Sequence, residues 1–115
     1  MRARLVCLFA FCAGPALAAD GGRLFADQCA ACHSLTAGSS DAGPSLKGIV
    51  WRRVAARTDF AYSGALKSLG GTWSPSRLND YLKDTQGVAP GTSMFVVVQD
   101  ETERKAIVAY LKDAR

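Results

Sequence analysis

Histidine and methionine are scarce in this chain. Its 115 residues contain one histidine, His33, and two methionines, of which only Met94 lies beyond the initiator position. Chemistry that needs two imidazoles from the same chain is therefore excluded. Long apolar runs are missing as well, because the longest, residues 5–13, falls short of the ~20 residues that a membrane-spanning helix requires. No stable membrane insertion is expected.

Two further absences narrow the fold and the partners. No segment alternates apolar and polar residues as a half-buried strand does, and the one β-branched run, residues 96–98, is too short to define a sheet. Repeats and internal linkers are also missing, which favours one all-α domain. The net charge is +4, but the basic residues are scattered and do not interleave with aromatics, so nucleic acid is not an expected partner.

The first 18 residues have the layout of a secretory signal peptide. Two arginines precede the short apolar run, and Ala16-Leu17-Ala18 provides the small residues that signal peptidase recognises. Cleavage is predicted after Ala18, with Ala19 as the alternative. Residues 1–18 are then removed, and residues 19–115 form a single exported domain.

Cys29-Ala30-Ala31-Cys32-His33 is the most informative motif in the chain. Two thiols three positions apart, followed at once by a histidine, form the attachment signature of a c-type haem. Residues at that spacing lie on one side of a helical turn, so both sulfurs can form thioethers with the vinyl groups on one edge of a porphyrin. The adjacent imidazole can then bind the iron. The motif predicts one haem c, held covalently through Cys29 and Cys32 and ligated by His33.

Other uses of a Cys-x-x-Cys pair are a thioredoxin-like dithiol, a structural disulfide or half of a zinc site. A thioredoxin-like pair needs a βαβ context, which the sequence does not show. Zinc needs two further ligands, and the remaining cysteines, Cys7 and Cys12, fall within the predicted signal peptide. Haem attachment is therefore preferred to these alternatives.

Met94 is the candidate for the sixth iron position. A lone methionine beside Phe95 and Val96 can also be a flexible core filler. Here it ends a loop punctuated by proline and glycine, residues 90–94, which could lay its thioether on the haem face opposite His33. A soft thioether ligand favours ferrous iron and raises the reduction potential relative to two nitrogen ligands. Together with the haem-attachment motif, this position predicts that Met94 is an iron ligand.

The first helix is predicted to carry the attachment cysteines. It should begin after Asp20, a suitable N-cap, and run to about Cys32. Phe25, Cys29 and Cys32 recur on one helical face within this range. Both sulfurs would then lie on that face, with Phe25 beside the haem.

Three more helices are predicted farther along the chain. Ser74-Pro75 is a serine cap followed by proline at the first helical position, which is a strong start signal. Asp100 and Glu103 resemble a capping box at the start of the C-terminal helix. The predicted ranges are about 63–69, 74–84 and 100 to the last residues, with a loop at 86–93. The fold class is thus all-α, with three or more helices wrapped around one covalently bound haem.

Taken in chain order, the motifs resemble those of the class I cytochromes c, the group of mitochondrial cytochrome c and bacterial cytochrome c2. The resemblance covers nearly all of the chain beyond the signal peptide. The segments that carry it are Gly21 with Phe25, Cys29–His33, Gly43–Gly48, Phe60–Ser63 with Trp73, Pro90–Met94 and Ile107–Lys112.

The resemblance implies roles for further residues. The carbonyl of Pro44 would fix the ring of His33, and Gly21 would let the first helix cross the last one near Tyr110. The side chains that would donate to a buried haem propionate are Arg52, Tyr62 and Trp73. Those that would hold Met94 and the adjacent propionate are Tyr81 and Thr92.

The chain departs from the family pattern where lysines usually surround the exposed haem edge. Gln28, Gln86, Gly87 and Ser93 stand at such positions, and Val96 stands where an aromatic residue is usual. Charge steering towards an acidic partner can raise association rates by roughly 10–10³-fold. This chain is therefore expected to depend less on steering, or to use the basic residues Arg23, Lys47, Lys83 and Lys105 instead.

The expected function is that of a soluble electron carrier in the periplasm. One-electron transfer would pass through a single haem c, and the protein would not act as an enzyme. The expected partners are redox proteins, with donor and acceptor unidentified, and the chain is expected to be a monomer. The alternatives are an electron-transfer subunit dedicated to one periplasmic dehydrogenase, and a haem-based enzyme or gas sensor, which would need an open iron site.

Overall fold

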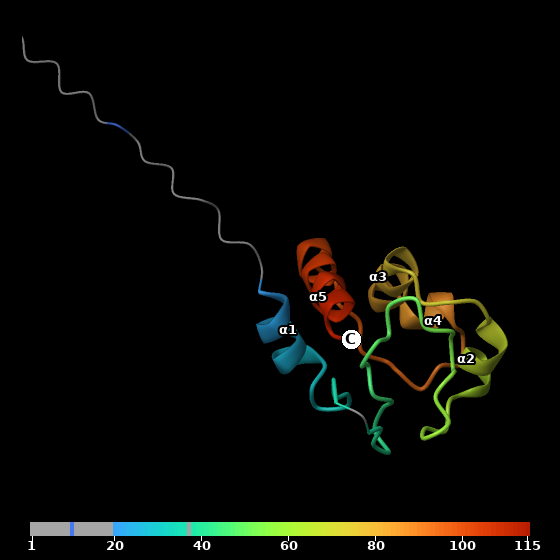
Figure 1. Cartoon of the computed structure of the whole chain (residues 1–115). Helices are drawn as coiled ribbons and strands as arrows, with labels where there is room; N and C mark the ends of the chain where they lie inside the picture. The colour runs from blue at the N-terminus through green and yellow to red at the C-terminus, as the bar shows by residue number, and fades with distance from the viewer. Residues whose placement is uncertain (1–9, 11–19, 37) are drawn as a thin grey trace, which may run out of the picture.

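The structure is a computed structural model that describes residue 10, residues 20–36 and residues 38–115. Apart from residue 10, the predicted signal peptide lies outside the described residues, and its removal stays a prediction. The described residues form five helices (Figure 1), whose bounds are α1 Gly21–Gln28, α2 Gly64–Leu69, α3 Pro75–Lys83, α4 Thr85–Val88 and α5 Glu101–Asp113. In the described part of the chain the only strand-like pairing is an isolated bridge between Arg53 and Thr72. The predicted all-α class is confirmed.

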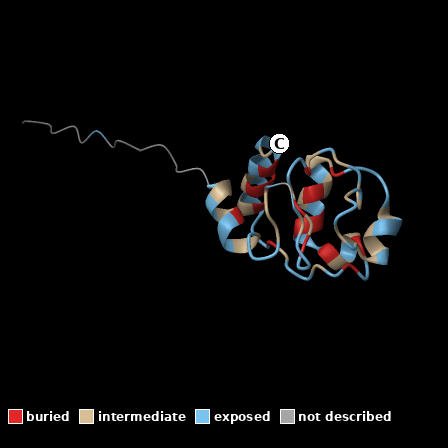
Figure 2. Ribbon diagram, turned by 60° about the horizontal axis from the view of Figure 1, so that its bottom comes forward, coloured by how far each residue is buried: buried red, intermediate tan, exposed pale blue. Residues whose placement is uncertain are grey.

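The long C-terminal helix organises the fold. It packs against α1 on one side and α3 on the other. Helix α2 lies beyond α4, and the loops of residues 38–62 run between α1 and α2 (Figure 1). Buried residues gather between the helices, and exposed residues cover the outside and much of the loops (Figure 2). None of the described helices is both long and apolar enough to cross a bilayer.

Side-chain caps set the starts of the described helices, and three of these caps, at Asp20, Ser74 and Asp100, were predicted from the sequence. The Ser74 hydroxyl accepts a hydrogen bond from the Arg77 amide (3.1 Å), and Pro75 occupies the first turn of α3. Asp100 accepts from the Glu103 amide (2.8 Å) at the start of α5. Asp20 and Ser63 cap α1 and α2 in the same way. Each cap satisfies an amide that the helix itself leaves without a partner.

Only one of the two hydrogen bonds of the capping box predicted at α5 forms, the one from the Glu103 amide to Asp100. The Glu103 carboxylate does not return to Asp100 but accepts a hydrogen bond from the Gln28 side-chain amide (3.1 Å). Gln28 is the last residue of α1, so this bond joins the ends of two helices that are far apart in sequence. The carboxylate therefore contributes to tertiary structure rather than to the local cap.

The prediction that α1 extends to Cys32 is wrong. The helix ends at Gln28, because the amides of Cys29 and Ala30 both donate to the Phe25 carbonyl and thereby close its last turn. A separate tight turn follows, in which Cys32 and His33 donate their amides to the Cys29 carbonyl. The second cysteine thus lies on a turn that projects beyond the helix.

A second correction concerns the predicted loop at 86–93. Its first part is helix α4, which overlaps the loop by three residues and is capped by Asp84 through the Gly87 amide (2.9 Å). One helical turn leaves too little periodicity to be recognised, and Gly87 disfavours a helix on propensity alone. Its stability comes from the cap and from the buried Thr85.

The close crossing of α1 and α5 requires a glycine. A Cβ at Gly21 would lie 2.8 Å from the Cβ of Tyr110 and would collide with the Ala106 carbonyl oxygen. The absence of a side chain lets the two helix backbones approach, as the family resemblance implied. Phe25 then packs on Tyr110 with its ring centroid 5.9 Å away.

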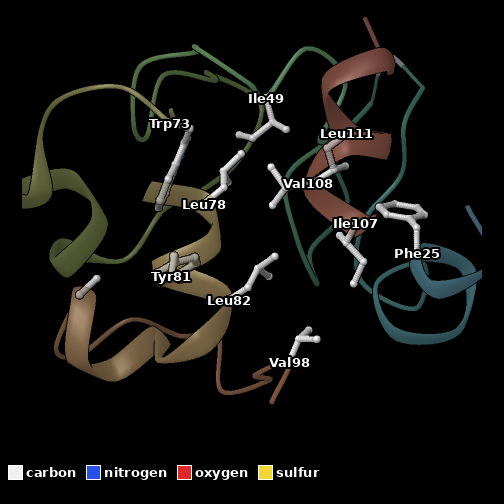
Figure 3. Packing of buried hydrophobic residues seen from close by; sticks show 11 residues of the cluster. Phe25, Ile49, Trp73, Leu78, Tyr81, Leu82, Val98, Ile107, Val108 and Leu111 are labelled. Carbon is white, nitrogen blue, oxygen red and sulfur yellow. The ribbon is translucent and has the colours of Figure 1, made fainter. Parts of the chain in front are cut away.

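The core lies between α3 and α5 and is built from aliphatic and aromatic side chains (Figure 3). Ile107, Val108 and Leu111 extend from α5 towards α3, which contributes Leu78 and Leu82. Two loop residues, Ile49 and Trp73, complete this side of the core. Their burial from water is the main force that holds the helices together.

Candidate cofactor site

A cavity of about 380 Å³ opens inside the helical core. Most of the side chains drawn in Figure 3 line it, and its wall is predominantly apolar. This volume and composition are typical of sites that hold a small-molecule cofactor. The four residues that the sequence analysis selected, Cys29, Cys32, His33 and Met94, all contribute to its wall. Residues more than sixty positions apart in sequence therefore meet at one site.

The two cysteines stand at the end of the cavity next to α1. Both are free thiols, Cys29 half-buried and Cys32 exposed. Burial raises the pKa of the Cys29 thiol, and the neighbouring Cys32 adds to this shift. The tight turn between them brings their side chains to the same cavity, which is the arrangement that thioether attachment at one haem edge requires.

His33 is held by a backbone carbonyl. Its Nδ1 lies 2.8 Å from the oxygen of Pro44. A carbonyl can only accept, so Nδ1 carries the proton and donates this bond, which leaves the lone pair on Nε2. The role that the resemblance implied for Pro44 therefore has its hydrogen bond in the structure.

Gly43 makes this arrangement possible. A Cβ at that position would lie 2.8 Å from Nδ1 of His33 and 2.6 Å from the Cys32 carbonyl oxygen. Any side chain would push the loop away from the imidazole and lengthen the bond to Pro44. The glycine before Pro44 is thus a steric requirement of the histidine's orientation.

The loop that carries Met94 is anchored from two directions. The hydroxyls of Tyr81 and Thr92 lie 2.7 Å apart in a buried hydrogen bond. The side-chain amide of Gln86 donates to the Thr92 carbonyl (2.9 Å), and its oxygen accepts from the Gly91 amide (3.2 Å). These bonds fix the residues just before Met94, which is itself half-buried at the cavity wall.

Sequence reasoning missed the role of Gln86. It was read only as a position where related proteins carry lysine, whereas the structure shows its amide clasping the methionine loop. Nothing in its spacing reveals this role, because the contacts depend on how α4 turns the chain. Tyr81 and Thr92 were correctly expected in this region. Burial raises the pKa of Tyr81, although its bond to Thr92 opposes the shift.

Arg52 forms a polar part of the cavity wall. Its guanidinium donates to the carbonyl oxygens of Lys47 (3.0 Å) and Ser45 (2.9 Å). Its Nε is buried and has no hydrogen-bond partner among the described residues, and burial lowers the pKa of the group. A buried donor without a partner is costly unless an acceptor joins it, and a carboxylate in the cavity would be a suitable one. Tyr62 and Trp73 line the same cavity.

The predicted position of Phe25 beside the haem stays a prediction. Phe25 is buried against Tyr110 between α1 and α5 and is not part of the cavity wall. Its periodicity with the cysteines suggested a shared face, but the helix ends before that face reaches them. Phe25 is a residue of the interface between the two helices.

The site fits a covalently attached haem. Its apolar wall suits a porphyrin, its two thiols stand together at one end, and the unpartnered Arg52 Nε suits an anionic substituent. The zinc alternative gains no support, because the described residues contain no cluster of three or more Cys, His, Asp and Glu side chains that could hold a metal ion.

Comparisons with known proteins agree with this chemistry. The sequence profile of the family Cytochrome c matches residues 18–115. A cytochrome c of Theileria annulata is 41% identical over 98 residues, which cover 84% of this chain and 84% of that protein. Cytochrome c2 iso-2 of Magnetospirillum fulvum is 39% identical over 86 residues, or 74% of this chain and 90% of the relative. The solved structure of cytochrome cH from Methylobacterium extorquens superposes with a TM-score of 0.76 at 38% identity, covering 84% of this chain and 97% of that one.

Proposed function

The chain belongs to the cytochrome c family, and from this premise we propose that it is a periplasmic electron carrier with axial ligands His33 and Met94. Members of the family are electron-transfer proteins rather than enzymes, and they bind haem c through cysteines that correspond here to Cys29 and Cys32. The predicted family, cofactor and absence of enzyme activity are confirmed. The haem-enzyme alternative is not retained. The axial ligation and the periplasmic location are the proposed parts.

The haem, when bound, supplies reversible one-electron chemistry at its iron. The protein's contribution begins with His33. Because its Nδ1–H donates to Pro44, its Nε2 is the nitrogen that can ligate a metal, and Gly43 keeps the imidazole in that orientation. This pre-oriented imidazole beside two free thiols is the observation that carries the proposal.

Met94 supplies the second ligand. Its loop is held before the methionine by the bonds of Thr92 with Tyr81 and Gln86. A thioether held in this way would keep its position when the iron changes oxidation state, which would limit the rearrangement that accompanies electron transfer. As the only methionine among residues 20–36 and 38–115, Met94 has no competing thioether.

The remaining wall excludes water and stabilises charge. Buried side chains from α3 and α5, among them Leu78, Leu82 and Ile107, shield the cavity from solvent. Arg52 offers its unpartnered Nε to a haem propionate. Because the apolar wall excludes water, electrostatic interactions inside the site, including that between Arg52 and a propionate, would be stronger than in solvent.

Partner redox proteins would meet the carrier at the rim of the cavity. Cys32 is exposed there, together with Phe95 (77% exposed) and Val96 (52% exposed), and all three line the cavity. Electrons would enter and leave at this rim. The chain would act as a monomer after residues 1–18 are removed during export to the periplasm.

The test is an optical redox titration of the mature protein, produced in a host that attaches haem c. The wild type should show a low-spin ferric spectrum with the weak far-red band of sulfur ligation, and its mass should include one haem. Met94→Ala should lose that band and become high-spin, whereas Phe95→Ala, the neighbouring exposed residue, should keep it. A high-spin ferric wild type that Met94→Ala does not alter would refute the proposed ligation.

A further inference from the structure

Trp51 has two features that the proposed electron-carrier function does not explain. Its side chain is 63% exposed, so it contributes little to the core. Its backbone φ is 69°, which lies in the left-handed region that residues other than glycine rarely adopt. The turn is fixed by two backbone hydrogen bonds, from the Trp51 amide to Trp73 (2.7 Å) and from the Arg52 amide to Ile49 (3.0 Å). A large aromatic side chain is therefore displayed at a position where folding alone would favour glycine.

A second hollow, separate from the cofactor cavity, lies beside this tryptophan. Its volume is about 410 Å³. At its edge the Gly48 amide donates a hydrogen bond to the Ala114 carbonyl (2.9 Å). Only Leu111 contributes to both cavities. The hollow is lined by Gly48, Val50, Trp51, Leu111, Lys112, Ala114 and Arg115.

The surroundings of the hollow are basic. Residues 42–58 include four basic residues and no acidic one. Two of the four have partners within the fold, since Arg52 donates to backbone carbonyls and Arg57 pairs with Asp59 (2.8 Å). A third, Arg53, lines the cofactor cavity. The exposed basic residues at the hollow are Lys112 and Arg115, which line it, and Lys47, which directly precedes the lining residue Gly48; Asp113 offsets part of their charge.

We propose that this surface, the Trp51 hollow, binds an acidic segment of a partner protein. An apolar side chain of the segment would enter the hollow against Trp51 and Leu111, while its carboxylates would pair with Lys112 and Arg115. Tryptophan is enriched among the residues that dominate binding energy at protein interfaces, and basic side chains orient carboxylates. The concave, partly apolar shape accommodates a peptide side chain better than it would a flat bilayer surface.

This contact would leave the cavity rim at Phe95 and Val96 free. The lining of the hollow contains none of the rim residues, so one partner could hold the carrier while electrons pass at the other surface. The hollow thus adds a second docking surface to the proposed electron carrier. Its occupation does not require any change at the haem ligands.

The test uses the haem-loaded protein and a capped peptide of alternating glutamate and aspartate with one central phenylalanine. Titration followed by amide NMR should shift the signals of Trp51, Lys112 and Arg115, and added salt should weaken the binding. Trp51→Gly should reduce the affinity by about tenfold or more, and its fold should persist because glycine adopts this φ freely. Phe95→Ala is the matched control, which removes an exposed aromatic from the rim and should leave peptide affinity unchanged.

Lys112→Glu gives a second measurement that does not alter the strained turn, and it should also weaken binding. The proposal is overturned if the peptide shifts map to the rim, or if both variants bind like the wild type. It is also overturned if vesicles of anionic phosphatidylglycerol, but not the peptide, bind in a Trp51-dependent manner. The optical spectrum and the redox titration of Trp51→Gly and Lys112→Glu should match those of the wild type, so failure here is distinguishable from failure of the ligation proposal.

Discussion

The two sides of the haem cavity are held by different kinds of interaction. On the helical side, α3 and α5 pack buried aliphatic residues such as Leu82 and Ile107 against each other. On the loop side, residues 38–62 contain no helix, and polar bonds hold them in place. Apolar packing is non-directional and follows sequence periodicity, whereas the polar side depends on individual contacts that must each be correctly placed.

Ser39, Ser45 and Asp59 form the centre of the polar side. The Asp59 carboxylate accepts from the Ser39 amide (3.1 Å) and hydroxyl (2.8 Å), and also from the Arg57 guanidinium (2.8 Å). The Ser39 hydroxyl in turn accepts from the amide of Ser45 (2.9 Å), which is fully buried. A chain of hydrogen bonds thereby replaces the secondary structure that this wall lacks.

The largest expected effect comes from the helical side. Ile107→Ala would remove a fully buried side chain from α5 and leave a void between the helices. We expect the free energy of unfolding of the haem-loaded protein to fall by about 2–5 kcal/mol, measured by urea denaturation. Ala109→Ser, on the exposed face of the same helix, should change it by less than about 0.5 kcal/mol. A loss at Ile107 as small as that of the control would show that α5 does not sustain the fold.

On the loop side, Gly43→Ala should have an intermediate effect. The new methyl group would collide with the Cys32 carbonyl and with the His33 ring. We expect a loss of about 1–3 kcal/mol by urea denaturation, together with a changed haem spectrum because the imidazole would lose its fixed orientation. Gly38→Ala serves as the control, since no atom lies within 4 Å of a Cβ at that position. An unchanged spectrum and unchanged stability in Gly43→Ala would contradict the proposed steric role.

Tyr81→Phe tests the bond that joins α3 to the methionine loop. Removal of the hydroxyl leaves the buried Thr92 hydroxyl without this partner, and we expect a loss of about 0.5–1.5 kcal/mol in thermal or urea unfolding. The far-red absorption band should become easier to lose on heating. Tyr110→Phe removes a hydroxyl from an exposed ring and should have no comparable effect.

The smallest effect is expected at Asp59 and depends on pH. Hydrogen bonds from Arg57, and then from Ser39, hold the pKa of Asp59 well below its ordinary value. The ionised carboxylate therefore stabilises the folded state fully above the unfolded-state pKa of about 3.9, and this contribution is lost as pH falls further. Asp59→Asn should be slightly less stable than the wild type near neutral pH, and the difference should shrink in acid.

Unfolding curves at several pH values would check this expectation. Asp41→Asn changes another exposed carboxylate of the same loop side and should give curves parallel to the wild type. A difference between Asp59→Asn and the wild type that grows towards acid pH would contradict the sign derived from the depressed pKa.

The sequence predicted the helical side better than the loop side, for a physical reason. Caps at Ser74 and Asp100 are local signals, and both helices begin where those residues indicate. The end of α1 and the four-residue helix α4 were missed, because closure of a last turn and one capped turn leave little trace in periodicity. The all-α fold and the family were predicted from motifs that the comparisons confirm.

Within the site, the residues that bind the cofactor were easier to predict than the residues that hold them in position. Cys29, Cys32, His33 and Met94 were selected from residue type and spacing, and the structure gathers them around one cavity. Gln86 was overlooked, since its bonds join segments whose proximity exists only after folding. Local patterns reveal the groups that react, whereas the groups that hold them depend on the tertiary fold.

The bond between Gln28 and Glu103 links the residue just before the first haem cysteine to the final helix. Together with the Phe25–Tyr110 contact, it brings the beginning and the end of the described domain together. The segment between helices α1 and α5, which supplies much of the cofactor cavity, is therefore held at both of its ends. Both contacts depend on α5, because Glu103 and Tyr110 belong to that helix.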